Sequence, residues 1–117
     1  MNVTLWINRI RNNKRGEGQI DYEEAREMRK RDSSILLLDV RSRQEYQEGN
    51  LPGSINLPVS QITKQIGKGI LVDKKKTVIV YCQSGSRSKK AKKILEKNGF
   101  LSVYELENAM DYIGRES

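Results

Sequence analysis

The stretch Thr77-Val-Ile-Val-Tyr-Cys-Gln-Ser-Gly-Ser-Arg-Ser88 decides the fold, because it joins three sequence signals without interruption. Residues 77–81 are a β-branched apolar run, which is typical of a central strand covered on both faces. Cys82 follows directly, a loop containing Gly85 comes next, and a helical pattern continues to about Asn98. The stretch therefore predicts a strand, a tight loop and a helix, with the cysteine at the carboxyl end of the strand.

Three more short apolar segments indicate further strands. Residues 35–38 form a continuous run that ends at Asp39, residues 103–105 form a last run, and a brief strand is expected near Ile55. Helical segments alternate with these strands, at residues 21–31, 42–47, 59–66 and 108–115. The alternation predicts an α/β fold with a mainly parallel central sheet of about five short strands, flanked by helices on both faces.

Two of the predicted helices have clear start signals. Asp21 with Glu24, and Ser42 with Glu45, stand at the spacing of a capping box, in which the pair satisfies two free backbone N–H groups. Gly99 stands where a glycine commonly ends a helix. We therefore expect helices to begin just after residues 21 and 42.

The first sixteen residues read as an extension. Apolar residues recur at i, i+3, i+4 and i+7 and basic residues occupy other positions, which predicts a short basic amphipathic helix. Polar residues 12–18 separate this segment from the rest. The sequence thus predicts an extension over residues 1–16 and one domain over residues 17–117. The extension either docks on its own domain or contacts a partner or a membrane surface.

Composition excludes several classes of chemistry. The chain of 117 residues has no histidine, which removes Ser-His-Asp hydrolysis, Cys-His pairs and histidine-ligated zinc. A single cysteine removes internal disulfides and CxxC redox pairs. No apolar run approaches the ~18 residues of a membrane span, and no signal peptide is visible. We expect a cytoplasmic protein with a reduced thiol and no membrane span.

Cys82 is the candidate reactive residue. Backbone N–H groups of the loop after it can form an anion-binding nest, and the following helix adds the partial positive charge of its N-terminus. Gly85 permits a positive φ, and Arg87 adds a permanent charge. Serine hydroxyls in the loop can donate further hydrogen bonds. These features favour the thiolate, which is the reactive form. The alternative is an ordinary buried thiol at a strand end.

Charged residues outside the loop have simpler interpretations. Asp39 and Arg41 end a neighbouring predicted strand, where they either orient the loop or pair with Arg87 and Glu45, in a structural rather than catalytic role. The net charge is +7, and Lys89, Lys90, Lys92 and Lys93 form either an electropositive rim or a solvated helix face. With seven aromatic residues, several of them in the core, no stacking platform is evident, so nucleic acid is not an expected partner.

Five motifs in chain order resemble the rhodanese-like sulfurtransferases. Cys82-Gln-Ser-Gly-Ser-Arg87 resembles the family's Cys-x-x-Gly-x-Arg active-site loop. The other four are Leu38-Asp-Val-Arg41, Glu45-Tyr46, Glu48-Gly-Asn-Leu-Pro-Gly-Ser-Ile-Asn56 and Val103-Tyr-Glu-Leu-Glu-Asn-Ala-Met-Asp-Tyr112. The resemblance covers about residues 18–113, and five motifs in the correct order are specific to the family.

The resemblance implies a single-domain sulfurtransferase. Sulfane sulfur would pass from thiosulfate or a persulfide to a thiol or cyanide, through a persulfide on Cys82. The implied substrate-binding residues are Gln83, Ser84, Gly85, Ser86, Arg87 and Ser88, and the implied loop-supporting residues are Asp39, Arg41 and Glu45. This chemistry needs no metal and no cofactor. The expected partners are a small anionic sulfur donor, a thiol acceptor and a sulfur-relay protein.

The chain departs from the family pattern at a few positions. Asn50 stands where the family usually has histidine, Glu107 and Asn108 where it has a glycine pair, and Tyr112 where tryptophan is common. These departures bear on substrate contacts and local backbone geometry.

Three other functions stay open. The domain could be a sulfur-relay or sensor module that acts with a partner protein. It could bind small anions or acidic surfaces through its basic faces. A phosphatase is a further option, although phosphatases and arsenate reductases of this superfamily have one more residue between cysteine and arginine. Here four residues separate Cys82 from Arg87, the length associated with sulfur.

Overall fold

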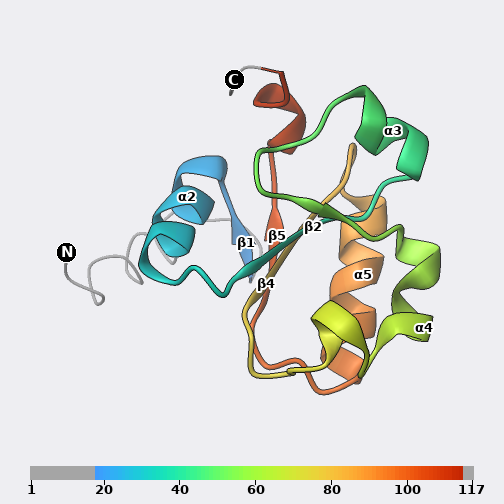
Figure 1. Ribbon diagram of the computed structural model, residues 1–117. Coiled ribbons are helices and arrows are strands. Elements are labelled where there is room, and N and C mark those ends of the chain that lie inside the picture. Colours follow the sequence, from blue (N-terminus) through green and yellow to red (C-terminus); the bar gives the residue numbers. More distant parts are fainter. Residues whose placement is uncertain (1–17, 115–117) are drawn as a thin grey trace.

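The computed structural model describes residues 18–114, which form an α/β fold around one sheet (Figure 1). All four strand pairings are parallel, and the strands follow the order β1-β5-β4-β2-β3. The strands are β1 Gln19–Ile20, β2 Leu36–Asp39, β3 Ile55–Asn56, β4 Val78–Tyr81 and β5 Val103–Leu106. β4 is therefore the central strand, and the predicted mainly parallel sheet is confirmed.

Helices cover both faces of the sheet, as predicted. The α-helices are α2 Tyr22–Arg31, α3 Arg43–Glu48, α4 Ile62–Gln65 and α5 Ser86–Lys97, and the 3-10 turns are Val59–Gln61, Gly69–Leu71 and Ala109–Asp111. Figure 1 shows α2 on one side of the sheet and α4 and α5 on the other. The carboxyl ends of the strands meet at one edge, which is where ligands bind in open α/β sheets.

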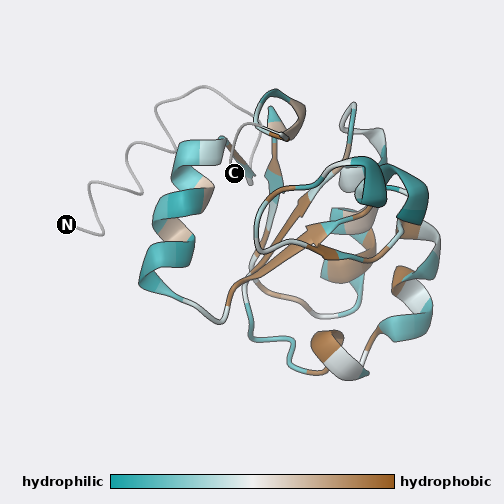
Figure 2. Cartoon of the chain, turned by 45° about the horizontal axis from the view of Figure 1, so that its top comes forward, coloured by the Kyte–Doolittle hydropathy of each residue, from teal (hydrophilic) through white to brown (hydrophobic). Residues whose placement is uncertain are grey.

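Alternation along the strands divides the core into two halves. In β2, Leu36 and Leu38 belong to the cluster that includes α5, whereas Leu37 belongs to the cluster that includes α2. In β4, Val78 and Val80 likewise face α5, and the intervening residues face α2. Because both faces are covered, β4 is apolar throughout and β2 is apolar up to Asp39, its last residue (Figure 2). Neighbouring positions on β4 thus project to opposite sides, and Cys82 belongs to the α5 side.

Both predicted capping boxes are present. The side chain of Asp21 accepts the Glu24 N–H at 2.9 Å, and Ser42 accepts the Glu45 N–H at 3.2 Å. At the other end of α5, Gly99 adopts a φ of +94°, the left-handed conformation in which glycine ends a helix. The local sequence signals therefore predicted the starts of α2 and α3 and the end of α5 correctly.

Two predicted elements differ from the structure, and one strand was missed. Residues 59–66 form a 3-10 turn followed by one α-helical turn instead of a continuous helix. The predicted helix over 108–115 is wrong: within the described residues only Ala109–Asp111 is helical, as a 3-10 turn. Its start at Asn108 has a φ of 2°, and Gly114 has a φ of +87°, so the backbone turns out of the helical region at both ends. β1 was not predicted, because two residues are too short to show a period.

The predicted extension over residues 1–16 lies outside the described residues, so its two alternatives stay open. Within residues 18–114, no helix is both long and apolar enough to cross a membrane. The described part of the chain also contains no group of three His, Cys, Asp or Glu side chains placed to hold a metal ion.

Tyr81 ties the central strand to the loop after α3. Its ring is fully buried, and its hydroxyl oxygen accepts the Leu51 N–H at 3.0 Å and donates to Ser54 Oγ at 3.2 Å. Burial raises the pKa of Tyr81 to about 12, so the hydroxyl stays protonated and available as a donor. The side chain therefore satisfies a buried backbone group that no strand reaches.

We expect Tyr81→Phe to lower the free energy of unfolding by about 1–3 kcal/mol, because the buried Leu51 N–H loses its acceptor. Urea denaturation followed by circular dichroism measures the change. Tyr104→Phe is the matched control, since the described residues give that hydroxyl no hydrogen bond. Equal stability of the two variants would contradict the role given to Tyr81.

Candidate active site

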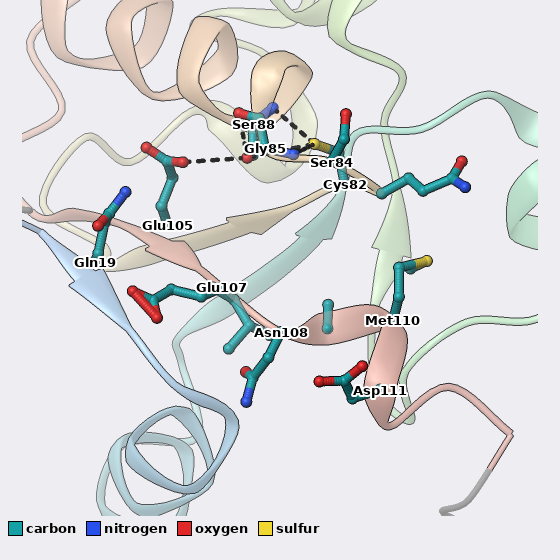
Figure 3. Close-up of a pocket in the computed structure, with 13 residues that line it drawn as sticks. Gln19, Cys82, Ser84, Gly85, Ser88, Glu105, Glu107, Asn108, Met110 and Asp111 are labelled. Atoms are coloured by element: carbon teal, nitrogen blue, oxygen red, sulfur yellow. Dashed lines mark hydrogen bonds between the residues drawn. The ribbon is translucent and has the colours of Figure 1, made fainter. Parts of the chain in front are cut away.

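Cys82 lies at the carboxyl end of the central strand, on the floor of a pocket. The pocket has a volume of about 410 Å³, and Cys82 is 5% exposed within it. One wall is the loop after Cys82, and the other is the end of β5 with the turn that follows (Figure 3). The sulfur is thus largely buried in the protein but borders a space open to a small molecule.

The sulfur of Cys82 caps helix α5. The first N–H groups of a helix lack acceptors within the helix, and a side chain at the N-cap position usually accepts one of them. Here the N-cap is Gly85, which has no side chain. The Cys82 sulfur takes that place, accepting the Ser88 N–H at 3.2 Å and the Gly85 N–H at 3.1 Å. Two donors and a helix N-terminus therefore point at the sulfur, an arrangement that favours negative charge on it.

Gly85 makes this geometry possible through its backbone. Its φ is +95°, in the region that side-chain-bearing residues avoid. A Cβ at this position would meet no atom within 4 Å, so the requirement for glycine comes from the dihedral angle and not from lack of space. The left-handed turn aims both N–H groups back toward the end of β4.

Ser88 connects the sulfur to a carboxylate on the neighbouring strand. Its Oγ lies 3.4 Å from Cys82 Sγ, 3.1 Å from the Gly85 carbonyl oxygen and 3.3 Å from Oε2 of Glu105. Ser88 is 1% exposed, and Glu105 is 8% exposed. Figure 3 shows these side chains in a row from the sulfur to β5.

Arg87 pairs with Glu45 and turns away from the pocket. The guanidinium donates to both carboxylate oxygens, at 2.6 and 2.9 Å. These bonds from Arg87, followed by the Ser42 N–H, lower the pKa of Glu45 to about 2. Hydrogen bonding to Glu45 is also the main cause of the raised pKa of Arg87, with Cys82 and Asp39 adding smaller electrostatic contributions. The pair ties the first turn of α5 to α3.

Asp39 and Arg41 form a second, separate ion pair. Arg41 Nη2 lies 2.6 Å from Asp39 Oδ2 and 2.6 Å from the Gly49 carbonyl oxygen, and both side chains are buried. Burial lowers the pKa of Arg41, but the hydrogen bonds and charge of Asp39 outweigh it and raise the pKa. The two residues pair with each other, so of the two alternatives given for them the structure does not show pairing with Arg87 and Glu45.

The structure brings most of the predicted loop residues to the pocket. Its lining includes Cys82 and four of the six residues after it, Gln83, Ser84, Gly85 and Ser88. Ser86 and Arg87 do not line it. Arg87 is positioned to hold the loop, whereas the other residues border the space where a substrate would lie.

Sequence reasoning missed the opposite wall of the pocket. That wall contains Gln19 and a continuous run from the end of β5, Glu105, Leu106, Glu107, Asn108, Ala109, Met110 and Asp111. The two departures noted at Glu107 and Asn108 do lie there. A signal for Glu105 was available in the sequence, since it stands two residues after the buried Val103 and therefore on the same face of β5.

The other two departures from the family pattern have local structural contacts. Asn50 Nδ2 donates to the Tyr46 carbonyl oxygen at 2.9 Å, which fastens the residue to the end of α3. Tyr112 stacks on Tyr22 with ring centroids 4.2 Å apart and an interplanar angle of 15°. Neither residue lines the Cys82 pocket.

Comparisons with known proteins agree with this geometry. The model of the rhodanese-like domain matches residues 21–115. A putative sulfur carrier protein YrkF of Bacillus subtilis is 29% identical over 85 residues, covering 72% of this chain and 44% of that protein. The thiosulfate sulfurtransferase PspE of Escherichia coli is 39% identical over 66 residues, covering 56% of this chain and 62% of that protein. The chain spans less than two thirds of these curated relatives.

Solved structures show the same fold. An Escherichia coli rhodanese solved with anions is 35% identical, covers 61% of this chain and 82% of its own, and has a TM-score of 0.57. A human single-domain sulfurtransferase has a TM-score of 0.69, covering 80% of this chain and 92% of its own at 23% identity. Together with the match to the family model, these likenesses show that the chain belongs to the rhodanese-like domain family.

Proposed function

We propose that the domain transfers sulfane sulfur through a persulfide on Cys82. In the first step the Cys82 thiolate attacks the outer sulfur of thiosulfate or of a persulfide. The S–S bond of the donor breaks, and its electron pair leaves on sulfite or on the donor thiolate. In the second step an acceptor thiolate or cyanide attacks the outer sulfur of the persulfide, and the electron pair returns to Cys82 as thiolate.

The observation that supports this proposal is the pair of N–H groups on the Cys82 sulfur. The Gly85 and Ser88 donors lie 3.1 and 3.2 Å from it, and they are held by the start of α5 before any substrate arrives. Donors fixed in advance stabilise negative charge at little reorganisation cost. The attacking thiolate and the thiolate regenerated after transfer are both anionic, so the same donors serve each step.

The absence of histidine is compatible with this chemistry. A thiolate already stabilised by its surroundings needs no neighbouring base to activate it. Of the relatives, PspE is named a thiosulfate sulfurtransferase and YrkF a putative sulfur carrier, and both names describe sulfur handling. A reduced thiol also suits a reducing compartment, and we therefore propose the cytoplasm as the location of the protein.

A sulfur relay with a partner protein is the second candidate function. The relative named as a sulfur carrier favours it. A relay module would accept sulfur from a protein persulfide and turn over thiosulfate slowly. Steady-state turnover with thiosulfate and cyanide, compared with loading from a persulfidated protein donor, separates the two candidates.

We expect thiosulfate or a persulfide to raise the intact mass of the protein by about 32 Da, the mass of one sulfur atom, because the transferred atom stays on Cys82. Cyanide should return the mass to its original value. Electrospray mass spectrometry of the intact protein measures both changes.

Cys82→Ser is the control for this experiment, because serine keeps an oxygen acceptor for the N–H groups of Gly85 and Ser88. The variant should show no gain in mass. An unchanged mass in the parent protein, or the same gain in the variant, would refute the proposal.

We expect the Glu45–Arg87 pair to make stability pH-dependent. The pKa of Glu45 falls from 4.5 to about 2 on folding, so its contribution is complete above pH 4.5 and is lost as the pH falls through about 2. With the side chains of Arg87 and Glu45 34% and 26% exposed, we expect a contribution of about 1 kcal/mol. Urea denaturation should therefore show that the free energy of unfolding falls more steeply between pH 6 and pH 3 for the parent protein than for Arg87→Met.

Arg43→Met is the matched control, since Arg43 is exposed on α3 and makes no ion pair within the described residues. The free energy of unfolding of Arg43→Met should change with pH in parallel with that of the parent protein. If Arg87→Met also gives a parallel profile, the pair does not contribute as described.

A further inference from the structure

We propose that Glu105 selects the substrates of Cys82 by charge, so that the site favours small persulfides and thiols bearing an ammonium group and disfavours dianionic thiosulfate. This inference rests on the proposed sulfur transfer and specifies its substrate class. It differs from the expectation of a small anionic sulfur donor, which the resemblance to the family implied.

The position of Glu105 supports this proposal. The residue lies on β5, the strand next to β4, and its side chain lines the same pocket as the Cys82 sulfur. Its Oε2 lies 3.3 Å from Ser88 Oγ, which in turn lies 3.4 Å from Cys82 Sγ. One serine hydroxyl therefore separates the carboxylate from the sulfur that a substrate must approach (Figure 3).

The nearby cations do not balance this carboxylate. Arg87 donates to both oxygens of Glu45, and Arg41 is buried against Asp39. No lysine or arginine is among the described residues that line the pocket. Two further acidic residues, Glu107 and Asp111, do line it. The proposal depends on Glu105 alone, because it is the buried one of the three and its carboxylate accepts a hydrogen bond from Ser88.

For a substrate in the pocket, the charge of Glu105 outweighs the net charge of the chain. The net charge of +7 and the exposed lysines of α5 act through solvent, where salt screens them beyond about 8–10 Å. Glu105 is 8% exposed and acts inside a pocket, where charges interact more strongly than in bulk water. Thiosulfate would bring two negative charges to this site. The persulfide of cysteamine brings the same kind of reacting sulfur with a cationic group two carbons away.

The size of the pocket fits a small molecule of this kind. Its volume of about 410 Å³ is within the range of small-molecule sites, and the segment after β5 forms the wall opposite the Cys82 loop. The polar groups of Glu105, Asn108 and Asp111 border the space opposite Cys82 (Figure 3). An ammonium group beyond the reacting sulfur would face these oxygens.

The experiment compares donors that differ in remote charge. The persulfides of cysteamine, 2-mercaptoethanol and mercaptoacetate present the same reacting group with a positive, neutral or negative substituent, and thiosulfate is the dianion. Stopped-flow loading with mass detection gives the rate at which Cys82 gains 32 Da from each. We expect the cysteamine persulfide to react about tenfold faster than the mercaptoacetate persulfide, with 2-mercaptoethanol between them.

Glu105→Gln removes the charge but keeps an oxygen that can accept the Ser88 hydroxyl. The ratio of variant to parent rates cancels the intrinsic reactivity of each donor. We expect this variant to react about tenfold faster with thiosulfate and to reduce the difference between the cationic and anionic persulfides to about twofold. Glu48→Gln is the matched control, because Glu48 is exposed on α3 and outside the pocket. Glu48→Gln should load from the four donors at rates in the same order as the parent protein.

The outcomes distinguish this inference from the proposed function. A mass gain with equal rates for the three persulfides, or an unchanged order in Glu105→Gln, would overturn the role of Glu105 and leave sulfur transfer intact. No mass gain from any of the four donors would overturn sulfur transfer itself. If Glu105→Gln does not fold, the parent rates decide the question after each is divided by the rate at which the same donor transfers sulfur to free cysteine, which cancels the intrinsic reactivity of that donor. Equal normalised rates for the three persulfides would then overturn the role of Glu105.

Discussion

Helix α5 begins at a residue that has no side chain to cap it, and the sulfur of Cys82 provides the missing acceptor. Gly85 can take a φ of +95°, and that turn directs its own N–H and the Ser88 N–H to the end of β4. Capping the helix and stabilising a negative sulfur are thus one interaction. A stable helix start and a reactive thiolate require the same atoms in the same places.

The order of the strands determines what surrounds the sulfur. β4 lies between β2 and β5, so the end of β2 brings Asp39 to one side and β5 brings Glu105 to the other. On the β2 side Arg41 balances the carboxylate in a buried pair. On the β5 side the carboxylate meets the Ser88 hydroxyl, which is a neutral partner. On this side no lysine or arginine is among the described residues that line the pocket.

Local signals predicted most of the fold because they act over a few residues. The capping pairs at Asp21 and Ser42 and the β-branched run before Cys82 each fix one element, and the structure has all three. β1 has two residues and forms by pairing with β5, so nothing in its own sequence indicates a strand. The sequence over 108–115 shows a helical pattern, but residues 108–111 line the pocket and only Ala109–Asp111 form a 3-10 turn.

The candidate site likewise has a part that local sequence signals predict and a part that they do not. Cys82 and the loop up to Ser88 are contiguous in sequence, so their proximity could be predicted. The pairing of Arg87 with Glu45 joins positions 42 residues apart, and a charge count gives no means of choosing Glu45 over Asp39 as the partner. The spacing from Val103 could have placed Glu105 on a buried face of its strand, but not beside Cys82, because that depends on which strand lies next to β4. A net charge of +7 suggests an anion site, yet the sheet order places an acidic wall beside the sulfur. Charge selectivity at Cys82 is therefore a property of topology, and composition alone predicts the opposite sign.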